Sequence, residues 1–331
     1  MSTVATTVRH FTRVSDLSPN EFERVLRIAA QLKHDPAHYD GALHGRTIAC
    51  IFEKPSTRTR VSFAGAAAEL GAMPVALSPQ ELQLGRGESL ADTARSLSGY
   101  CAAIVIRSFL QSTVDELAEW ATVPVVNALS DEHHPCQALA DFLTIEQAHG
   151  GLHGARLAFV GDGGDNVAHS LLEAGALAGA HVTVACPSEY APKPEILARA
   201  RGLGELTGAT LDIVTDPIDA VTGADAVYAD VWTSMGEEGE QSERARVLRP
   251  YEVTEELMAL ARPDAIFLHC LPAKRGEEVD AAVIDGPRSA VWAQSANRMP
   301  TEAALLLALT HGFEPSSGSP ASDSVARSRA V

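Results

Sequence analysis

The chain has 331 residues, a length that favours two domains over one. Hydrophobic residues make up 46% of it and charged residues 21%, which excludes a collagen-like or wholly disordered protein. Asp and Glu outnumber Lys and Arg by 43 to 26, so the formal net charge is −17. This balance argues against a protein that binds nucleic acid by neutralising its phosphates.

The cysteines and the apolar runs indicate where the protein works. The five cysteines show no CxxC or paired spacing, so neither a disulfide framework nor a zinc ribbon is expected. The first residues contain no apolar run, and no stretch of about 20 apolar residues occurs, so we expect no signal peptide and no membrane span. The sequence therefore predicts a soluble, cytoplasmic protein.

In the first half of the chain, short apolar runs alternate with amphipathic segments. Ser18 is expected to cap the first helix, with Pro19 at its first position. A second helix is expected from Pro55, because apolar residues recur after it at helical spacing. The other helices are expected at 93–100, 113–120 and 135–147, and the strands at 46–52, 73–77, 102–107 and 123–127.

The same alternation begins again after the turn-rich segment 149–154. Helices are expected from Val167, from Pro194 and over 300–311, and strands at 156–160, 181–185, 211–214, 226–229, 265–269 and 289–292. The polar stretch 237–249 is expected to be a mobile loop, and 314–331 a disordered tail. The pattern predicts an α/β fold with two wound parallel-sheet domains of similar size, helices on both faces, and helices joining them.

A candidate anion site lies in the segment 52–60, where a strand gives way to a helix. The first turn of a helix has unpaired N–H groups and the positive end of the dipole. Here Ser56, Thr57, Arg58 and Thr59 add hydroxyl and guanidinium groups, which suits a phosphate. The alternative is a well-capped surface helix with solvated arginines.

Two further candidates lie where strands of the first half end. Arg107 ends the strand 102–107, at the edge of the sheet where ligands bind in open α/β folds. His134 and Gln137 lie in the next strand-to-helix turn, with Pro135 opening the helix. These side chains can bind a substrate's oxygen or amide group. A surface cation and a structural histidine are the alternatives.

The second half contains a turn of the pattern G-x-G-x-x-N over 161–166. It lacks the third glycine of a dinucleotide site, and the next strand has no acidic residue at its end to bind a ribose, so a nicotinamide site is not favoured. His269 and Cys270 are neighbours on a strand, so their side chains should point apart and should not form a nucleophile–base pair. A metal site of His134, His269 and cysteines lacks recognisable ligand spacing, and Cys270 alone could be an inert buried thiol.

Taken together, S-T-R-T-R, H-P-C-Q and H-C-L-P resemble the aspartate/ornithine carbamoyltransferase family, over about residues 10–312. F-E-K-x-S-T-R-T-R, D-x-W-x-S-M-G and H-C-L-P look like its ornithine branch. The resemblance implies transfer of the carbamoyl group of carbamoyl phosphate to ornithine, giving citrulline and phosphate. It implies a carbamoyl phosphate domain over 1–148, an ornithine domain over 149–295, and a helix over 296–313 returning to the first domain.

The resemblance also implies roles for single residues. Ornithine would contact Asn166, Asp230, Ser234 and Met235, and the catalytic residues would be Arg107, His134, Asp230 and Cys270, the last as a thiolate that helps to orient ornithine. Gln83 would reach the site of a neighbouring subunit. The residues implied for carbamoyl phosphate are Ser56, Thr57, Arg58, Thr59, Gln83, Arg107, His134, Gln137, Cys270, Leu271 and Arg298.

In such a reaction Thr59, Arg107 and His134 would polarise the carbamoyl oxygen, and no metal or organic cofactor is expected. The expected partners are the two small substrates and identical subunits, in a homotrimer or a multiple of trimers. Asp165 departs from the family pattern and could alter the ornithine pocket. Two alternatives remain open: a carbamoyltransferase for another amine, such as putrescine or lysine, and a non-catalytic anion-binding regulator.

Overall fold

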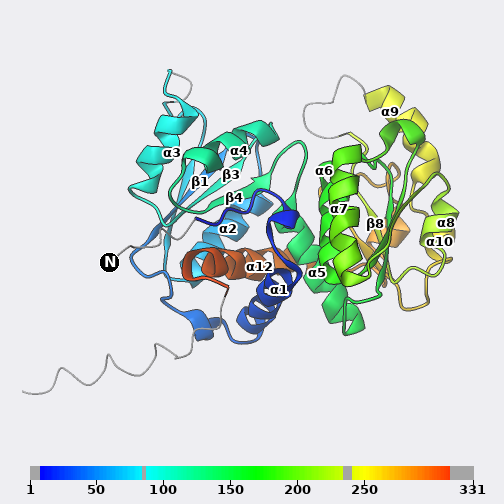
Figure 1. Cartoon of the computed structure of the whole chain (residues 1–331). Helices are drawn as coiled ribbons and strands as arrows, with labels where there is room; N and C mark the ends of the chain where they lie inside the picture. Colours follow the sequence, from blue (N-terminus) through cyan, green and yellow to red (C-terminus); the bar gives the residue numbers. More distant parts are fainter. Residues whose placement is uncertain (1–7, 84–86, 234–240, 314–331) are drawn as a thin grey trace, which may run out of the picture.

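The computed structural model describes residues 8–83, 87–233 and 241–313, which form two α/β domains (Figure 1). Every strand pairing within the two sheets is parallel. The first sheet has the strand order β2-β1-β3-β4 and the second has the order β7-β6-β5-β8-β9. The predicted fold class is therefore confirmed.

The first domain follows the predicted alternation closely. Ser18 caps α1 by accepting the N–H of Glu21, and Pro19 is the first helical residue, as predicted. Its strands are β1 (Thr47–Phe52), β2 (Met73–Leu77), β3 (Ala103–Arg107) and β4 (Val125–Leu129). Its main helices are α1 (Pro19–His34), α2 (Arg58–Glu69), α3 (Leu90–Ser98), α4 (Gln111–Trp120) and α5 (Pro135–His149).

The second domain contains more short helices than the sequence predicted. Its strands are β5 (Arg156–Val160), β6 (His181–Ala185), β7 (Leu211–Val214), β8 (Ala226–Ala229) and β9 (Ile266–Leu268). Its helices are α6 (Asn166–Ala178), α7 (Pro194–Thr207), α8 (Pro217–Val221), α9 (Gln241–Leu248), α10 (Glu255–Met258) and α11 (Ala281–Ile284). The expected loop over 237–249 is thus wrong for 241–248; the rest of the segment before it lies outside the described residues.

The end of the chain corrects two further predictions. Instead of a strand at 289–292, Ser289 makes a single bridge with Phe267, and α12 (Val291–His311) begins two residues later. Pro300 does not start this helix but lies inside it. A proline removes one intrahelical hydrogen bond, and here the packing of α12 against α1, α2 and α5 holds the helix together across that gap.

Alternate residues of a strand point to opposite faces of the sheet and pack into different apolar clusters. Helices therefore cover both faces. In β3, Ile104 and Ile106 pack with α3 and α4, whereas Ala103 and Val105 belong to a cluster shared with α1, α2, α5 and α12. This cluster continues into α6 and β6 of the second domain, so it joins the two domains. Within the described residues, no helix is both long and apolar enough to cross a bilayer.

Candidate active site

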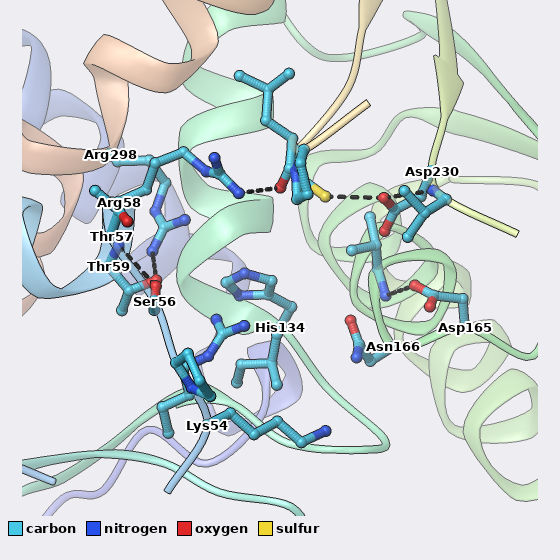
Figure 2. Close-up of a pocket in the computed structure, with 18 of the residues that line it drawn as sticks. Lys54, Ser56, Thr57, Arg58, Thr59, His134, Asp165, Asn166, Asp230 and Arg298 are labelled. Atoms are coloured by element: carbon cyan, nitrogen blue, oxygen red, sulfur yellow. Dashed lines mark hydrogen bonds between the residues drawn. The ribbon is translucent and has the colours of Figure 1, made fainter. Parts of the chain in front are cut away.

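A cavity of about 400 Å³ lies where the carboxyl ends of both sheets face each other (Figure 2). In the first sheet β1 lies between β2 and β3, and in the second β5 lies between β6 and β8, so the chain changes direction across the sheet at these strands. Ligands of open α/β sheets bind at such points. The predicted residues that line the cavity are Ser56, Thr57, Arg58, Thr59, Arg107, His134, Asn166, Asp230, Cys270, Leu271 and Arg298.

The segment 56–59 forms the start of α2, with Thr57 as the N-cap residue. The Oγ of Ser56 accepts the backbone N–H of Thr59 at 3.2 Å, which orders the turn. Arg58 does not extend into solvent: its Nη2 donates to the carbonyl of Leu271, in the other domain, at 2.6 Å. Burial lowers the pKa of Arg58. The segment is therefore part of the cavity wall and not a solvated helix start.

Arg107 ends β3, where the pairing with β4 shifts by one residue. Its side chain is buried, so the surface-cation alternative is wrong. Burial, together with the guanidinium groups of Arg298 and Arg58, lowers the pKa of Arg107 to about 10, which leaves it charged at pH 7. Among the described residues, its Nε has no hydrogen-bond partner. A buried cation with an unpartnered donor indicates a place for an anion.

His134 is the N-cap residue of α5 and Pro135 follows it in the first turn, as predicted. Burial and the nearby Arg298, Arg107 and Arg58 hold the pKa of His134 well below its usual value, so the ring is neutral at pH 7. Within the part of the chain that the structure describes, Nδ1 of this ring has no hydrogen-bond partner. A neutral imidazole still has one N–H to donate.

Gln137 lies in the first turn of α5, as predicted, but it does not line the cavity. Its Oε1 accepts from Nη1 of Arg298 at 2.8 Å, and its Nε2 donates to Asp141 at 2.7 Å. Arg298 also pairs with Glu302 at 2.7 Å. Gln137 thus holds the guanidinium group of Arg298 from behind. Gln83 is exposed and does not line this cavity, so its predicted role would need a second chain.

The second domain contributes the turn 161–166 before α6. Asp165 caps the helix by accepting the N–H of Val167 at 2.7 Å, so its carboxylate has a structural task beside any effect on a substrate. Nδ2 of Asn166 donates to the carbonyl of Ser130 at 3.0 Å. A Cβ on Gly163 would lie 2.8 Å from Sγ of Cys186, which explains the glycine there by close packing.

Asp230 and Cys270 follow β8 and β9 and lie together, with Sγ of Cys270 donating to Oδ1 of Asp230 at 3.1 Å. Burial is the main cause that raises the pKa of Asp230. Burial and the neighbouring Asp230 raise the pKa of Cys270 well above its usual value. The expected thiolate is therefore wrong for this state, because a thiol donates to the carboxylate. Ser234 and Met235 lie outside the described residues.

β9 ends at Leu268, so neither His269 nor Cys270 lies on the strand, and the expectation that their side chains point apart is wrong. His269 does not line the cavity, and both of its ring nitrogens have other partners. Nδ1 accepts the N–H of Leu271 at 2.9 Å, and Nε2 lies 3.2 Å from Glu278. Donor atoms of Asp230, His269 and Cys270 lie within 4.8 Å of one another, a grouping that the sequence did not predict and that does not include His134. The contacts of the His269 ring with Leu271 and Glu278 hold the turn that carries Cys270 and Leu271.

Sequence reasoning missed several cavity residues, notably Lys54, Thr233 and Lys274. Lys54 lies two residues before Ser56, the first residue named for the anion site, and Figure 2 shows its side chain extending along the cavity below His134. Lys274 lies three residues after Leu271 in the turn that follows β9. Their closeness to predicted residues in the same loops was the available signal.

The cavity therefore combines a cationic wall from one domain with a carboxyl–thiol pair from the other, and comparison with known proteins gives the class. The model of the aspartate/ornithine carbamoyltransferase carbamoyl-P binding domain matches residues 9–147, and that of the Asp/Orn binding domain matches residues 153–309. The chain belongs to this family of carbamoyl-group transferases.

Three individual relatives belong to one branch of this family. The chain is 55% identical over 299 residues to the ornithine carbamoyltransferase of Acidothermus cellulolyticus, covering 90% of this chain and 96% of the relative. It is 51% identical to that of Clavibacter sepedonicus, with 90% and 97% covered. The solved ornithine carbamoyltransferase of Pyrococcus furiosus is 46% identical, with a TM-score of 0.87 and coverage of 92% of this chain and 98% of that one.

Proposed function

We propose that the chain transfers the carbamoyl group of carbamoyl phosphate to the side-chain amine of L-ornithine, giving L-citrulline and phosphate. The observation that carries this proposal is the convergence of Arg58, Arg107 and Arg298 on one buried wall of the cavity. Among the described residues, neither Arg58 nor Arg107 forms an ion pair with a carboxylate. A dianionic phosphate would supply the missing charge. The names of the relatives support the choice of ornithine as acceptor.

The phosphate would bind at the start of α2, to Ser56, Thr57 and Arg58, with Arg107 and Arg298 beside it. Unpaired N–H groups and the helix dipole favour an anion there. Each charge-assisted hydrogen bond contributes roughly 1.5–3 kcal/mol. Gln137 would take part through Arg298, because its amide oxygen accepts from that guanidinium group. Leu271 borders the same wall through its carbonyl.

The carbamoyl oxygen would accept hydrogen bonds from Thr59, Arg107 and His134. Since the pKa of His134 is held well below its usual value, the ring would act as a neutral donor and not as a cation. These donors would stabilise the negative charge that develops on the oxygen as the tetrahedral intermediate forms.

Ornithine would bind on the opposite wall, with Asn166, Asp230, Ser234, Met235 and Cys270. A cationic α-amine would pair with Asp230 and favour its ionised form, against the effect of burial. The attacking amine must be neutral, which costs roughly 4–5 kcal/mol at pH 7 for a lysine-like pKa near 10.4. It attacks the carbamoyl carbon, the C–O bond to phosphate breaks, and the departing phosphate can accept the proton.

We propose 1–148 as the carbamoyl phosphate domain, 149–295 as the ornithine domain and 296–313 as a helix that returns to the first. The packing of α12 against α1 and α2 supports the last of these assignments. We also propose a cytoplasmic homotrimer, or a multiple of trimers, in arginine biosynthesis or the reverse direction, with Gln83 of one chain serving the site of another. Light scattering of the purified protein tests the assembly.

The decisive experiment measures citrulline formation from carbamoyl phosphate and ornithine, with putrescine, lysine and aspartate tested in parallel. Turnover on ornithine alone is expected. Turnover on putrescine or lysine instead would keep the anion site but overturn the assignment of Asp230, Ser234 and Met235.

The anion site is tested by calorimetry with carbamoyl phosphate. Arg58→Ala is expected to abolish measurable binding of carbamoyl phosphate, because the Arg58 guanidinium group would contact the phosphate. Arg60→Ala is a matched control in the same helix, since that side chain is exposed and stacks 4.8 Å from the Phe52 ring. Near-normal affinity of the Arg58 variant would contradict the assignment.

A further inference from the structure

Three side chains on one face of α6, in the second domain, hold the loop of the first domain that carries His134. Nδ2 of Asn166 binds the Ser130 carbonyl at 3.0 Å, and Nδ1 of His169 lies 3.0 Å from the Glu132 carbonyl. Oγ of Ser170 accepts the backbone N–H of His134 at 2.8 Å. Positions 169 and 170 follow position 166 by three and four residues, about one helical turn, so the three side chains share a helix face.

The hydroxyl group of Ser170 makes two hydrogen bonds that fix its orientation. The residue is fully buried and does not line the cavity. Its hydroxyl donates its one proton to the carbonyl of Asn166 at 2.8 Å, which leaves a lone pair to accept from His134. The orientation of the hydroxyl is therefore determined by the helix itself.

The backbone of His134 depends on this contact. His134 has φ −127° and ψ 63°, outside the helical range, and its side chain makes no capping hydrogen bond. Within the described part of the chain, Nδ1 of its ring has no partner either. Since no hydrogen bond at Nδ1 orients the ring, its position depends on the backbone that Ser170 holds and on the packing around the buried side chain.

We propose that Ser170 is a positioning residue that orients His134 toward the carbamoyl group from the opposite domain. This inference rests on the proposed function, in which His134 donates to the carbamoyl oxygen. It also connects the two halves of the site, because the same helix face carries Asn166, a proposed ornithine contact. A purely structural role, in which Ser170 only satisfies a buried N–H group, is the competing explanation.

Ligand binding and turnover separate these explanations. Ser170→Ala is expected to lower kcat by about 10- to 100-fold, since small misplacements of a catalytic group have effects of this size. It should weaken carbamoyl phosphate binding but leave inorganic phosphate binding within about twofold, because the arginines are untouched. Ser170→Cys, which keeps the size and a weak acceptor, should give an intermediate kcat and serves as the test if the alanine variant does not fold.

A double-mutant cycle gives the sharper result. His134→Ala removes the ring but keeps the backbone N–H, so any structural cost of Ser170→Ala persists in that background. If Ser170 acts through the ring, adding Ser170→Ala to His134→Ala causes no further loss of kcat. Thr207→Ala is the matched control: it removes a 2.6 Å hydrogen bond to the Ala176 carbonyl near the other end of α6, and kcat should stay within about twofold.

Additive losses in the cycle, or unchanged kcat in both folded Ser170 variants, would overturn the positioning role. Equal weakening of carbamoyl phosphate and inorganic phosphate would do the same. If His134→Ala alone left turnover unchanged, the fault would lie in the proposed function of His134, which distinguishes the two failures.

Discussion

The two walls of the cavity treat charge in opposite ways. On the first domain, Arg58 and Arg107 remain charged at pH 7 although burial lowers the pKa of each. On the second, Asp230 and Cys270 share a hydrogen bond, and burial raises the pKa of both groups. The cationic wall thus keeps its charge while desolvated, whereas the acidic wall is held closer to neutrality.

This difference indicates how the two substrates would be recognised. Burying a charge without a partner is costly, and a dianion entering the cationic wall would remove that cost. A cation that binds beside Asp230 would favour its ionised form, against the effect of burial. The first wall is therefore preorganised, and the second responds to its ligand.

The largest effect is expected from breaking the cationic wall at Arg107. Arg107→Ala should lower kcat by about 10³-fold, the scale found when a donor to a developing oxyanion is removed. Arg107→Lys should stay strongly impaired, because an ammonium group lacks the planar fork of guanidinium. Arg95→Ala, at an exposed arginine of α3, is the control. A kcat within tenfold of the unaltered protein would contradict the preorganised wall.

The acidic wall is tested by Asp230→Asn, which keeps the shape but removes the charge. The kcat/KM for ornithine should fall by roughly 10- to 100-fold, the value of one charge-assisted hydrogen bond. The dissociation constant of carbamoyl phosphate should stay within about twofold, since the other wall is intact. Asp264→Asn, at an exposed aspartate of the same domain, controls for charge removal. Loss of carbamoyl phosphate binding instead would show that the walls are not independent.

A pH titration tests Asp141, which holds Gln137 behind Arg298 of the cationic wall. Burial raises the pKa of Asp141 to about 7, and its Oδ1 accepts from both Gln137 and Gln294. Between pH 5 and 8 the folded state binds more protons at this group than the unfolded state, so stability falls as pH rises. In Asp141→Asn, the decrease in the free energy of unfolding between pH 5 and 8, measured by denaturant unfolding, should be smaller by roughly 2 kcal/mol. Identical pH profiles for the two proteins would show that Asp141 is ionised when folded.

The smallest effect is expected at Asp165, beside the acidic wall. Asp165→Asn should change the KM for ornithine by less than about threefold and leave the melting temperature unaltered, because Asn caps a helix as well as Asp does. Asp165→Ala should destabilise the fold by about 1 kcal/mol. A large change in KM with Asn would mean that the carboxylate contributes to ornithine binding beyond its cap.

Local signals predicted most of the fold and of the first wall. Capping at Ser18, helical spacing and short apolar runs placed the elements of the first domain within a few residues. The same signals failed at Pro300, where packing of α12 against three other helices outweighs the local cost of proline. They also missed α9, whose polar sequence resembles a loop.

The sequence by itself predicted that one strand ends at Arg107, that two others end shortly before Asp230 and Cys270, and that a helix begins within a few residues of Arg58. Hydrophobic period and capping act over a few residues, which is why these positions could be read locally. Only the tertiary structure decided that Arg58 crosses to Leu271, that Gln137 lies behind Arg298 and that Ser170 holds His134. These contacts join residues 36 to 213 positions apart. Such pairs follow from how segments far apart in the chain pack together, which no local pattern encodes.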